Sequence, residues 1–462
     1  TKRYGFQFGG PIVQNKSGFL LDFEARDIHE PTVVDALTLD TSAHTVPFAA
    51  SVSAPKLLLI GSARVDWQLT PTNVLALRYD FDRGRLDNLG VGGFSLPENG
   101  FDNLTSTNGI RISDIAAFGS RISNEARLGI TLERTKQQPA SSATEILVPG
   151  AFISGGAASQ SLDHREWHFE FDDYLSLTAG KHSLKLGTQL LDRDIHDSSS
   201  AGFNGAFVFG GGLAPELDSA GHVVSGPGGP TLISISGLEQ YRRTLLGLPG
   251  GVPTKFSLTG GDPFASVNQL YATLFVQDQW RFRPDMLVSL GMRYEAQNEP
   301  SFSAGFAPRL GLAYSPDKAQ KWVLRARAGM FYNRVDQTLD LQAERLNGTT
   351  QQQILVNSPA FPDPFAAGST NEVIPTLRRL ASDIRAPRSL QLQVGFERQL
   401  PHGWKIAMNE NWARGWASLL SRNINAPLIG LGLNPSSAAR PLGVAENLLE
   451  FESAGSLKGD VI

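Results

Sequence analysis

Hydrophobic and polar residues alternate along much of the chain, in runs that come in pairs. The clearest pair spans residues 267–296, where apolar side chains at every second position are separated by mostly polar ones such as Gln277, Gln279 and Arg293. A period of two is typical of a β-strand with one apolar and one polar face. Arg283-Pro284-Asp285 lies between the two runs and predicts a tight turn, so the pair is expected to form a hairpin.

The same paired pattern recurs from one end of the chain to the other. The further pairs of runs are 4–12 with 19–25, 57–69 with 75–81, 110–118 with 126–132, 167–177 with 184–186, 306–314 with 322–332, and 390–396 with 404–412. Together with the first pair they predict about 14 strands. Several runs are longer than the five or six residues usual in soluble sheets, which favours strands that cross a membrane.

The connections between the predicted strands alternate in length. Those after odd-numbered strands are tight, whereas most of those after even-numbered strands are long, namely 28–55, 83–106, 136–163, 196–265 and 334–387. Outer-membrane β-barrels have short periplasmic turns and long extracellular loops. The sequence therefore predicts an all-β fold, a transmembrane antiparallel β-barrel, with the long connections outside the cell. A short extra strand is expected within 203–209.

Tryptophans cluster near the predicted tight turns. Trp67, Trp280, Trp322 and Trp404 lie there, and Trp412 lies toward the opposite strand end. Aromatic side chains form girdles where a barrel meets the membrane surfaces, so these five residues are predicted to mark the two girdles.

Charged residues on the polar faces of the strands are predicted to line a water-filled lumen. They are Glu166, Glu170, Asp172, Arg281, Arg293, Arg325 and Arg327. Paired carboxylates also occur in glycoside hydrolases. A lumen carrying charges of both signs explains these better, and no catalytic residue is predicted.

Composition narrows the function classes. Charged residues make up 19% of the chain, the net charge is −4, and there is no cysteine. Nucleic-acid binding is not expected, because it normally requires a basic patch. Disulfides and thiolate metal sites are excluded, because both require cysteine. The chain has no apolar run of about 18 residues, as a membrane-spanning helix would need. No cofactor is predicted.

Two groups of residues invite a search for metal sites. Asp80, Asp82 and Asp87 surround a glycine bend and are a candidate calcium loop, although the terminal glutamate of such loops is missing. His164 and His168 are four apart, a spacing that pairs ligands on a helix but separates them on a strand. We therefore interpret His168 as a lumen residue and His164 as a residue at the loop edge, and predict no metal site there.

Several segments together resemble a known family. They include Gly180–Gly187, Phe275–Arg281 followed by Leu290–Glu295, and Phe306–Pro316. Their order and spacing resemble the barrel of Oar-like TonB-dependent transporters, which are outer-membrane receptors. The resemblance implies a barrel of about 22 strands, a plug domain that carries the TonB box, and energy supplied by the TonB complex. Neither the plug nor the box is recognisable in this sequence, so we expect the chain to be an internal barrel fragment, with residues 450–455 leading into another strand.

The predicted function is therefore uptake or export of a cargo across the outer membrane of a Gram-negative-type bacterium. The expected partners are outer-membrane lipid, a plug domain of the same full-length chain, the TonB complex and an unidentified cargo, with no nucleic acid. Two alternatives remain open at this point. One is a passive porin or surface-adhesion barrel, and the other is a soluble all-β carbohydrate-binding or hydrolytic protein.

Overall fold

A computed structural model describes residues 1–317, 319, 321–366, 373–428 and 439–461. Its main feature is a 15-stranded sheet in which neighbouring strands are antiparallel, in the order β1-β2-β3-β4-β5-β6-β9-β10-β17-β18-β19-β20-β23-β24-β27. The strands are β1 (Lys2–Val13), β2 (Ser17–Leu39), β3 (Thr45–Thr70), β4 (Asn73–Leu89), β5 (Phe101–Phe118), β6 (Ile122–Pro139), β9 (Leu162–Ala179), β10 (His182–Ser199), β17 (Phe264–Arg283), β18 (Met286–Gln297), β19 (Phe302–Tyr314), β20 (Trp322–Tyr332), β23 (Arg388–Gln399), β24 (Lys405–Trp416) and β27 (Ser456–Val461).

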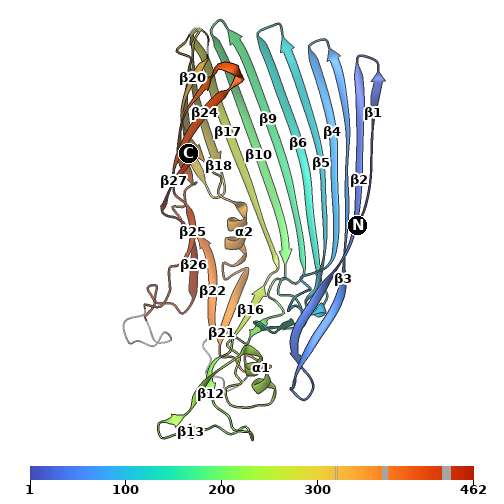
Figure 1. The fold of residues 1–462 in the computed structure, drawn as a ribbon, viewed down its shortest axis with the longest axis vertical. Coiled ribbons are helices and arrows are strands. Elements are labelled where there is room, and N and C mark those ends of the chain that lie inside the picture. The colour runs from blue at the N-terminus through green and yellow to red at the C-terminus, as the bar shows by residue number, and fades with distance from the viewer. Residues whose placement is uncertain (318, 320, 367–372, 429–438, 462) are drawn as a thin grey trace.

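The sheet curves into a trough whose edges are β1 and β27 (Figure 1). Within the described residues, each of these two strands pairs on one side only. Short turns join the strands at one end of the trough, and long connections gather at the other end (Figure 1). We call these the turn end and the loop end.

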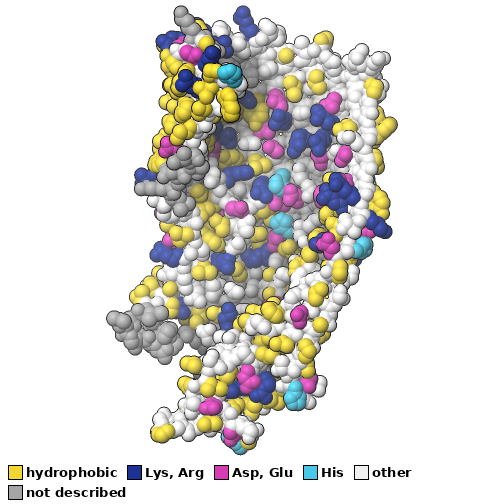
Figure 2. All heavy atoms as spheres, viewed as in Figure 1, with side chains coloured by type: hydrophobic (Ala, Val, Ile, Leu, Met, Phe, Trp, Pro, Cys, Tyr) yellow, Lys and Arg dark blue, Asp and Glu magenta, His cyan; other side chains and the backbone are white. Residues whose placement is uncertain are grey.

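The two faces of the sheet differ as the alternation predicts. Large apolar side chains on the outer face are exposed, for example Leu274 at 58% and Leu310 at 55%. The hollow holds many charged side chains, whereas apolar ones lie along its outer rim (Figure 2). Large apolar side chains left open on one face of a sheet need a non-aqueous partner, and lipid provides one.

The connections build a second, 8-stranded sheet at the loop end, in the order β25-β26-β22-β21-β16-β11-β7-β8. Its strands are β7 (Glu145–Val148), β8 (Phe152–Ser154), β11 (Ala206–Val208), β16 (Lys255–Gly261), β21 (Gln351–Asn357), β22 (Val373–Leu380), β25 (Leu419–Asn423) and β26 (Asn447–Ser453). A compact apolar core that includes Val148, Phe207, Phe209 and Phe256 packs beneath it. The long connections therefore form a second sheet that has its own apolar core.

Smaller elements complete the loop end and the turns. They are β12 (Gly212–Pro215) with β15 (Leu232–Ile235), β13 (Ser225–Gly226) with β14 (Gly229–Pro230), the helices α1 (Gly237–Leu245) and α2 (Gln337–Arg345), and two 3-10 turns at Pro97–Asn99 and Pro401–Gly403. Among the described residues no helix has the length and apolar character needed to cross a membrane.

The predicted fold class is confirmed, and the structure corrects some details. Residues 28–55 are mostly strand rather than loop, because β2 and β3 stay paired from Ser17↔Trp67 to Leu39↔Thr45. The sheet has one strand more than predicted, since β27 adds to β24. Residues 450–455 lead into another strand as predicted, because β27 follows them, but most of them already belong to β26 of the loop-end sheet. The predicted connection 334–387 contains α2, β21 and β22, and its residues 367–372 lie outside the described ones.

Candidate functional site: the inner wall and helix α2

The inner face of the trough carries the charged residues that the alternation assigns to it. Arg293 contacts Glu295 at 2.6 Å, and Arg325 contacts Glu397 at 3.0 Å. Arg327 lines a hollow on this face together with Gln277 and Gln393. Strand alternation places Arg281 on the same face as Gln277, although the structure gives its side chain no polar partner among the described residues. Arg293 is therefore balanced within its own strand and Arg325 by the neighbouring strand β23.

Glu166 on β9 lies at the centre of a polar network near the loop end. It is 5% exposed, and its Oε1 accepts hydrogen bonds from Arg193 Nε at 2.5 Å and from Gln337 Nε2 at 2.8 Å. His164 Nε2 lies 3.7 Å from its other oxygen. A buried carboxylate is costly unless charged and polar groups surround it, and here they come from three different elements.

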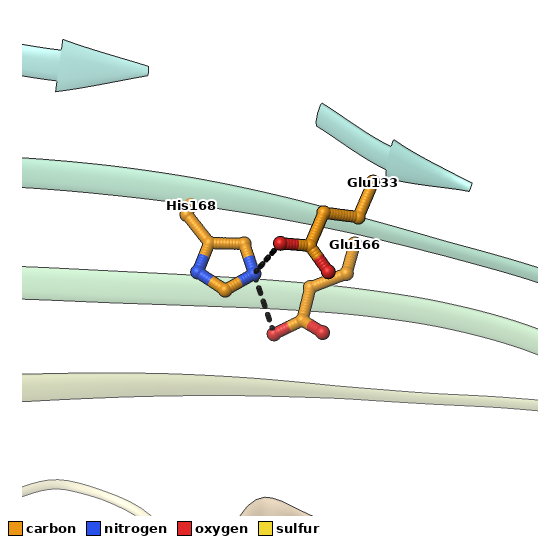
Figure 3. Close-up of side chains that lie close together, drawn as sticks. All are labelled: Glu133, Glu166 and His168. Carbon is orange, nitrogen blue, oxygen red and sulfur yellow. Dashed lines mark ion pairs between the residues drawn. The ribbon is translucent and has the colours of Figure 1, made fainter. Parts of the chain in front are cut away.

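Glu133, Glu166 and His168 form the one cluster within the described ranges whose geometry could hold a metal ion (Figure 3). His168 Nε2 lies 3.2 Å from Glu166 and 3.8 Å from Glu133. The donor set does not fit a cation well, because the Arg193 guanidinium already occupies the Glu166 oxygen that faces His168. A metal there would have to displace that guanidinium, so the cluster is better described as an ion-pair network.

The other predicted carboxylates take separate places. Glu170 lines the hollow beside Arg193, and Asp172, also on β9, is 5% exposed. The candidate calcium ligands do not come together. Asp80 contacts Arg78 and Asp87 contacts Arg85, and strand alternation places Asp80 and Asp87 on opposite faces of β4. The calcium hypothesis is therefore not supported by the geometry.

Four of the five predicted girdle tryptophans lie near strand ends, and Trp412 lies within β24. Trp67 and Trp404 are 47% and 73% exposed, and Trp322 stacks under Arg398 with 4.4 Å between the guanidinium and the ring centre. Trp280 stacks on His182 near the turn end, and Trp412 pairs with Leu392 further along the sheet. Their role as membrane girdles stays a prediction.

Helix α2 lies inside the trough against the wall (Figure 1). Its first residue, Gln337, donates to Glu166, and its last residue, Arg345, contacts Asp197 of β10. Arg345 Nη1 also donates to the carbonyls of Pro263 at 2.9 Å and Ser199 at 3.2 Å. Polar contacts at both of its ends therefore hold the helix to β9, β10 and the start of β17.

Asp340 sits in the middle of α2 and faces the wall. It is 5% exposed, its Oδ2 accepts one long hydrogen bond of 3.4 Å from Gln269 Nε2, and its Oδ1 has no partner among the described residues. Burial, together with the nearby carboxylates Glu299 and Asp336, raises the pKa of Asp340 to about 7. The helix therefore docks most favourably with this acid protonated.

Sequence reasoning did not find α2 or its anchors. Glu166 and Gln337 are 171 positions apart, and no local pattern connects them. One signal was available, because Asp336 before Gln337-Thr338 is a good helix N-cap and its side chain does accept from Thr338 N at 2.7 Å.

A long antiparallel sheet, curved around a charged hollow and apolar on its outside, defines a transmembrane β-barrel. The chain belongs to the outer membrane beta barrel domain family, whose model matches residues 48–305 and 300–458. It is thus a protein of the bacterial outer membrane.

Solved structures of outer-membrane proteins share the fold. The outer membrane transporter YddB from Escherichia coli is similar with a TM-score of 0.64 and 11% identity, over 99% of this chain and 50% of that one. The ferric enterobactin receptor PfeA from Pseudomonas aeruginosa has a TM-score of 0.56 and 14% identity, over 99% of this chain and 56% of that one. The siderophore receptor PirA from Acinetobacter baumannii has a TM-score of 0.56 and 12% identity, over 99% of this chain and 56% of that one. The chain thus spans about half the length of these structures, and at such identities the similarity shows the fold alone. No curated protein matches the chain.

Proposed function

We propose that this chain is the barrel wall of a TonB-dependent outer-membrane transporter. The observation that carries the proposal is the 15-stranded sheet with an apolar outside and a charged inside, which is similar in fold to transporters and siderophore receptors. The turn end would face the periplasm, and the loop end with its second sheet would face the outside of the cell.

The open edges of the trough support a larger barrel. Among the described residues β1 and β27 each leave one edge unpaired, and such backbone groups would be costly in lipid, because no water is available there to satisfy them. Further strands that pair with both edges would close the wall. A plug domain of the same full-length protein would then fill the hollow and contact charges such as Arg327 and Arg325.

In this function the barrel performs no covalent chemistry. Cargo would bind at the loop end, and the TonB complex would move the plug to open a path. Two of the similar structures are, by their descriptions, receptors for siderophores or for ferric enterobactin, so a ferric siderophore is the first cargo to test. Glycans, peptides and an exported cargo remain further candidates.

Two measurements on the full-length protein test the proposal. An energised transporter closed by a plug is expected to bind the purified periplasmic domain of TonB and to give no steady conductance in a planar lipid bilayer. A passive porin would give steady conductance and no TonB binding, and that pair of results would refute the proposal. Extraction from membranes without detergent would instead point to a soluble β-protein.

A further inference from the structure

A polar pocket lies between the inner wall and the segment that leads into α2. Its volume is about 680 Å³, which is in the range of small-molecule sites. The wall side comes from β9, β10 and β17 to β20, and the other side is formed by residues 333–337. The pocket therefore exists only because the connection after β20 folds back into the trough.

Four arginines line this pocket, and two of them are neutralised. Arg193 is bonded to Glu166, and Arg293 contacts Glu295 at 2.6 Å. Glu295 is 4% exposed and also accepts a hydrogen bond of 2.6 Å from the Tyr271 hydroxyl. These groups satisfy one another and leave little capacity for a ligand.

The other two, Arg309 and Arg334, have no carboxylate within ion-pair distance in the part of the chain that the structure describes. Each instead lies over an aromatic ring. The Arg309 guanidinium is 4.7 Å from the centre of Phe331, and that of Arg334 is 5.1 Å from the centre of Tyr271. A cation–π contact with a ring uses none of the N–H donors of a guanidinium, so these donors stay available for a planar acceptor.

The backbone beside Arg309 is shaped for this stack. A side chain at Gly329 would place a Cβ 3.0 Å from Phe331 Cε2 and 3.5 Å from Arg309 Cγ. Glycine at that position lets the Phe331 ring lie under the guanidinium without crowding. The wall thus orients the Arg309 side chain through Phe331 and Gly329, while the side chain stays exposed to the hollow.

We propose that Arg309 and Arg334 bind an oxyanion, either a carboxylate or a phosphate, carried by the transported ligand. Guanidinium groups form paired, charge-assisted hydrogen bonds with such groups. Glu170, Glu295 and Asp336 also line the pocket, and Glu166 neutralises Arg193 from beside it, so four arginines are matched by four carboxylates and the pocket carries no excess charge. The site therefore favours ligands of small net negative charge over strongly anionic ones. The inference deepens the proposed function and rests on it for the role of the ligand as cargo.

Titration calorimetry of the full-length protein in detergent tests the site, with acetate, citrate and inorganic phosphate as separate probes. Binding of acetate or citrate would identify a carboxylate site, and binding of phosphate alone a phosphate site. Arg309→Gln and Arg334→Gln are each expected to weaken binding roughly tenfold to a hundredfold, as loss of a charged hydrogen-bond pair implies. Arg309→Lys keeps the charge but not the planar fork, and an intermediate affinity is expected.

Arg327→Gln is the matched control, because Arg327 is on the same face of β20 as Phe331 and lines only the adjoining hollow, which Arg309 also borders, and not the pocket that holds Arg334. It should bind the probes as the wild type does. Absence of binding for all probes, or equal affinity in the wild type and in the Arg309 and Arg334 variants, would overturn the proposal. Because the titration needs no TonB, its failure leaves the bilayer and TonB-binding tests of the proposed function unaffected.

Discussion

Replacing Asp340 by asparagine should hold helix α2 against the barrel wall at neutral and alkaline pH. The pKa of Asp340 is raised to about 7 in the docked helix, mainly by burial, and an aspartate in water has a pKa near 4. Such a difference corresponds to about 4 kcal/mol in the docking equilibrium.

The direction follows from proton binding. The docked state holds the proton of Asp340 more tightly than the undocked state, so docking is strongest below about pH 4. It weakens as pH rises from about 4 to about 7, and the full cost is present above pH 7. The groups around Asp340 that enter this balance are Glu299 and Asp336, with Gln269 as its hydrogen-bond donor. Asparagine cannot ionise and removes the pH dependence.

The absence of cysteine from the chain makes the assay direct. A spin label on Glu344→Cys, an exposed position of α2, reports how mobile the helix is in the full-length protein in lipid nanodiscs. In the wild type the mobile fraction is expected to rise between pH 5 and pH 8, by up to about a hundredfold in the equilibrium constant. With Asp340→Asn it should stay low throughout. Asp383→Asn, an exposed acid of the same connection, is the control and should behave as the wild type.

The reasoning would be refuted by an unchanged pH response in Asp340→Asn, because some other group would then control docking. A helix that stays immobile at every pH in the wild type would equally contradict it.

Three further predictions concern the wall and its contacts. Arg345→Ala removes the contacts to Asp197 and to two carbonyls, so the label on α2 should become mobile even at pH 5. Leu310→Arg on the outer face should lower the free energy of unfolding by about 2–4 kcal/mol in denaturant titrations, whereas Gln393→Arg on the inner face should change it little. Gly187→Val would place a Cβ 2.4 Å from Phe275 Cε1, so a loss of about 1–3 kcal/mol is expected, partly recovered when Phe275→Ala is added.

The sequence was sufficient to predict the wall but not what lies within it. The alternation in a run such as 272–282 predicts a strand and also which of its side chains face outward. It predicts the neighbouring strand as well, because hairpin partners are adjacent in sequence. The order of the sheet confirms this from β1 to β24. The extension of β2 and β3 through 28–55 was missed, since residues such as Pro31 and Pro47 resemble loop signals although they lie in paired strands.

The inner site depended on contacts between distant positions. Asp340 meets Gln269 across 71 residues, and Arg345 meets Asp197 across 148. Arg309 was visible only as one more charge on an alternating strand. Its stacking on Phe331, and its lack of a carboxylate partner within the described part of the chain, emerge from the register of β18, β19 and β20. Local patterns cannot report such contacts, because a connection of more than 50 residues can fold back in many ways.

The most direct test of the central claim is a cysteine-labelling scan along β17 of the full-length protein in intact outer membranes. Single cysteines at Leu274 and Val276 are expected to resist a water-soluble maleimide, because their side chains face lipid. Cysteines at Gln277 and Gln279 should react, because their side chains line the hollow. Labelling that does not alternate along the strand, or equal reactivity at all four positions, would contradict a lipid-sealed barrel wall.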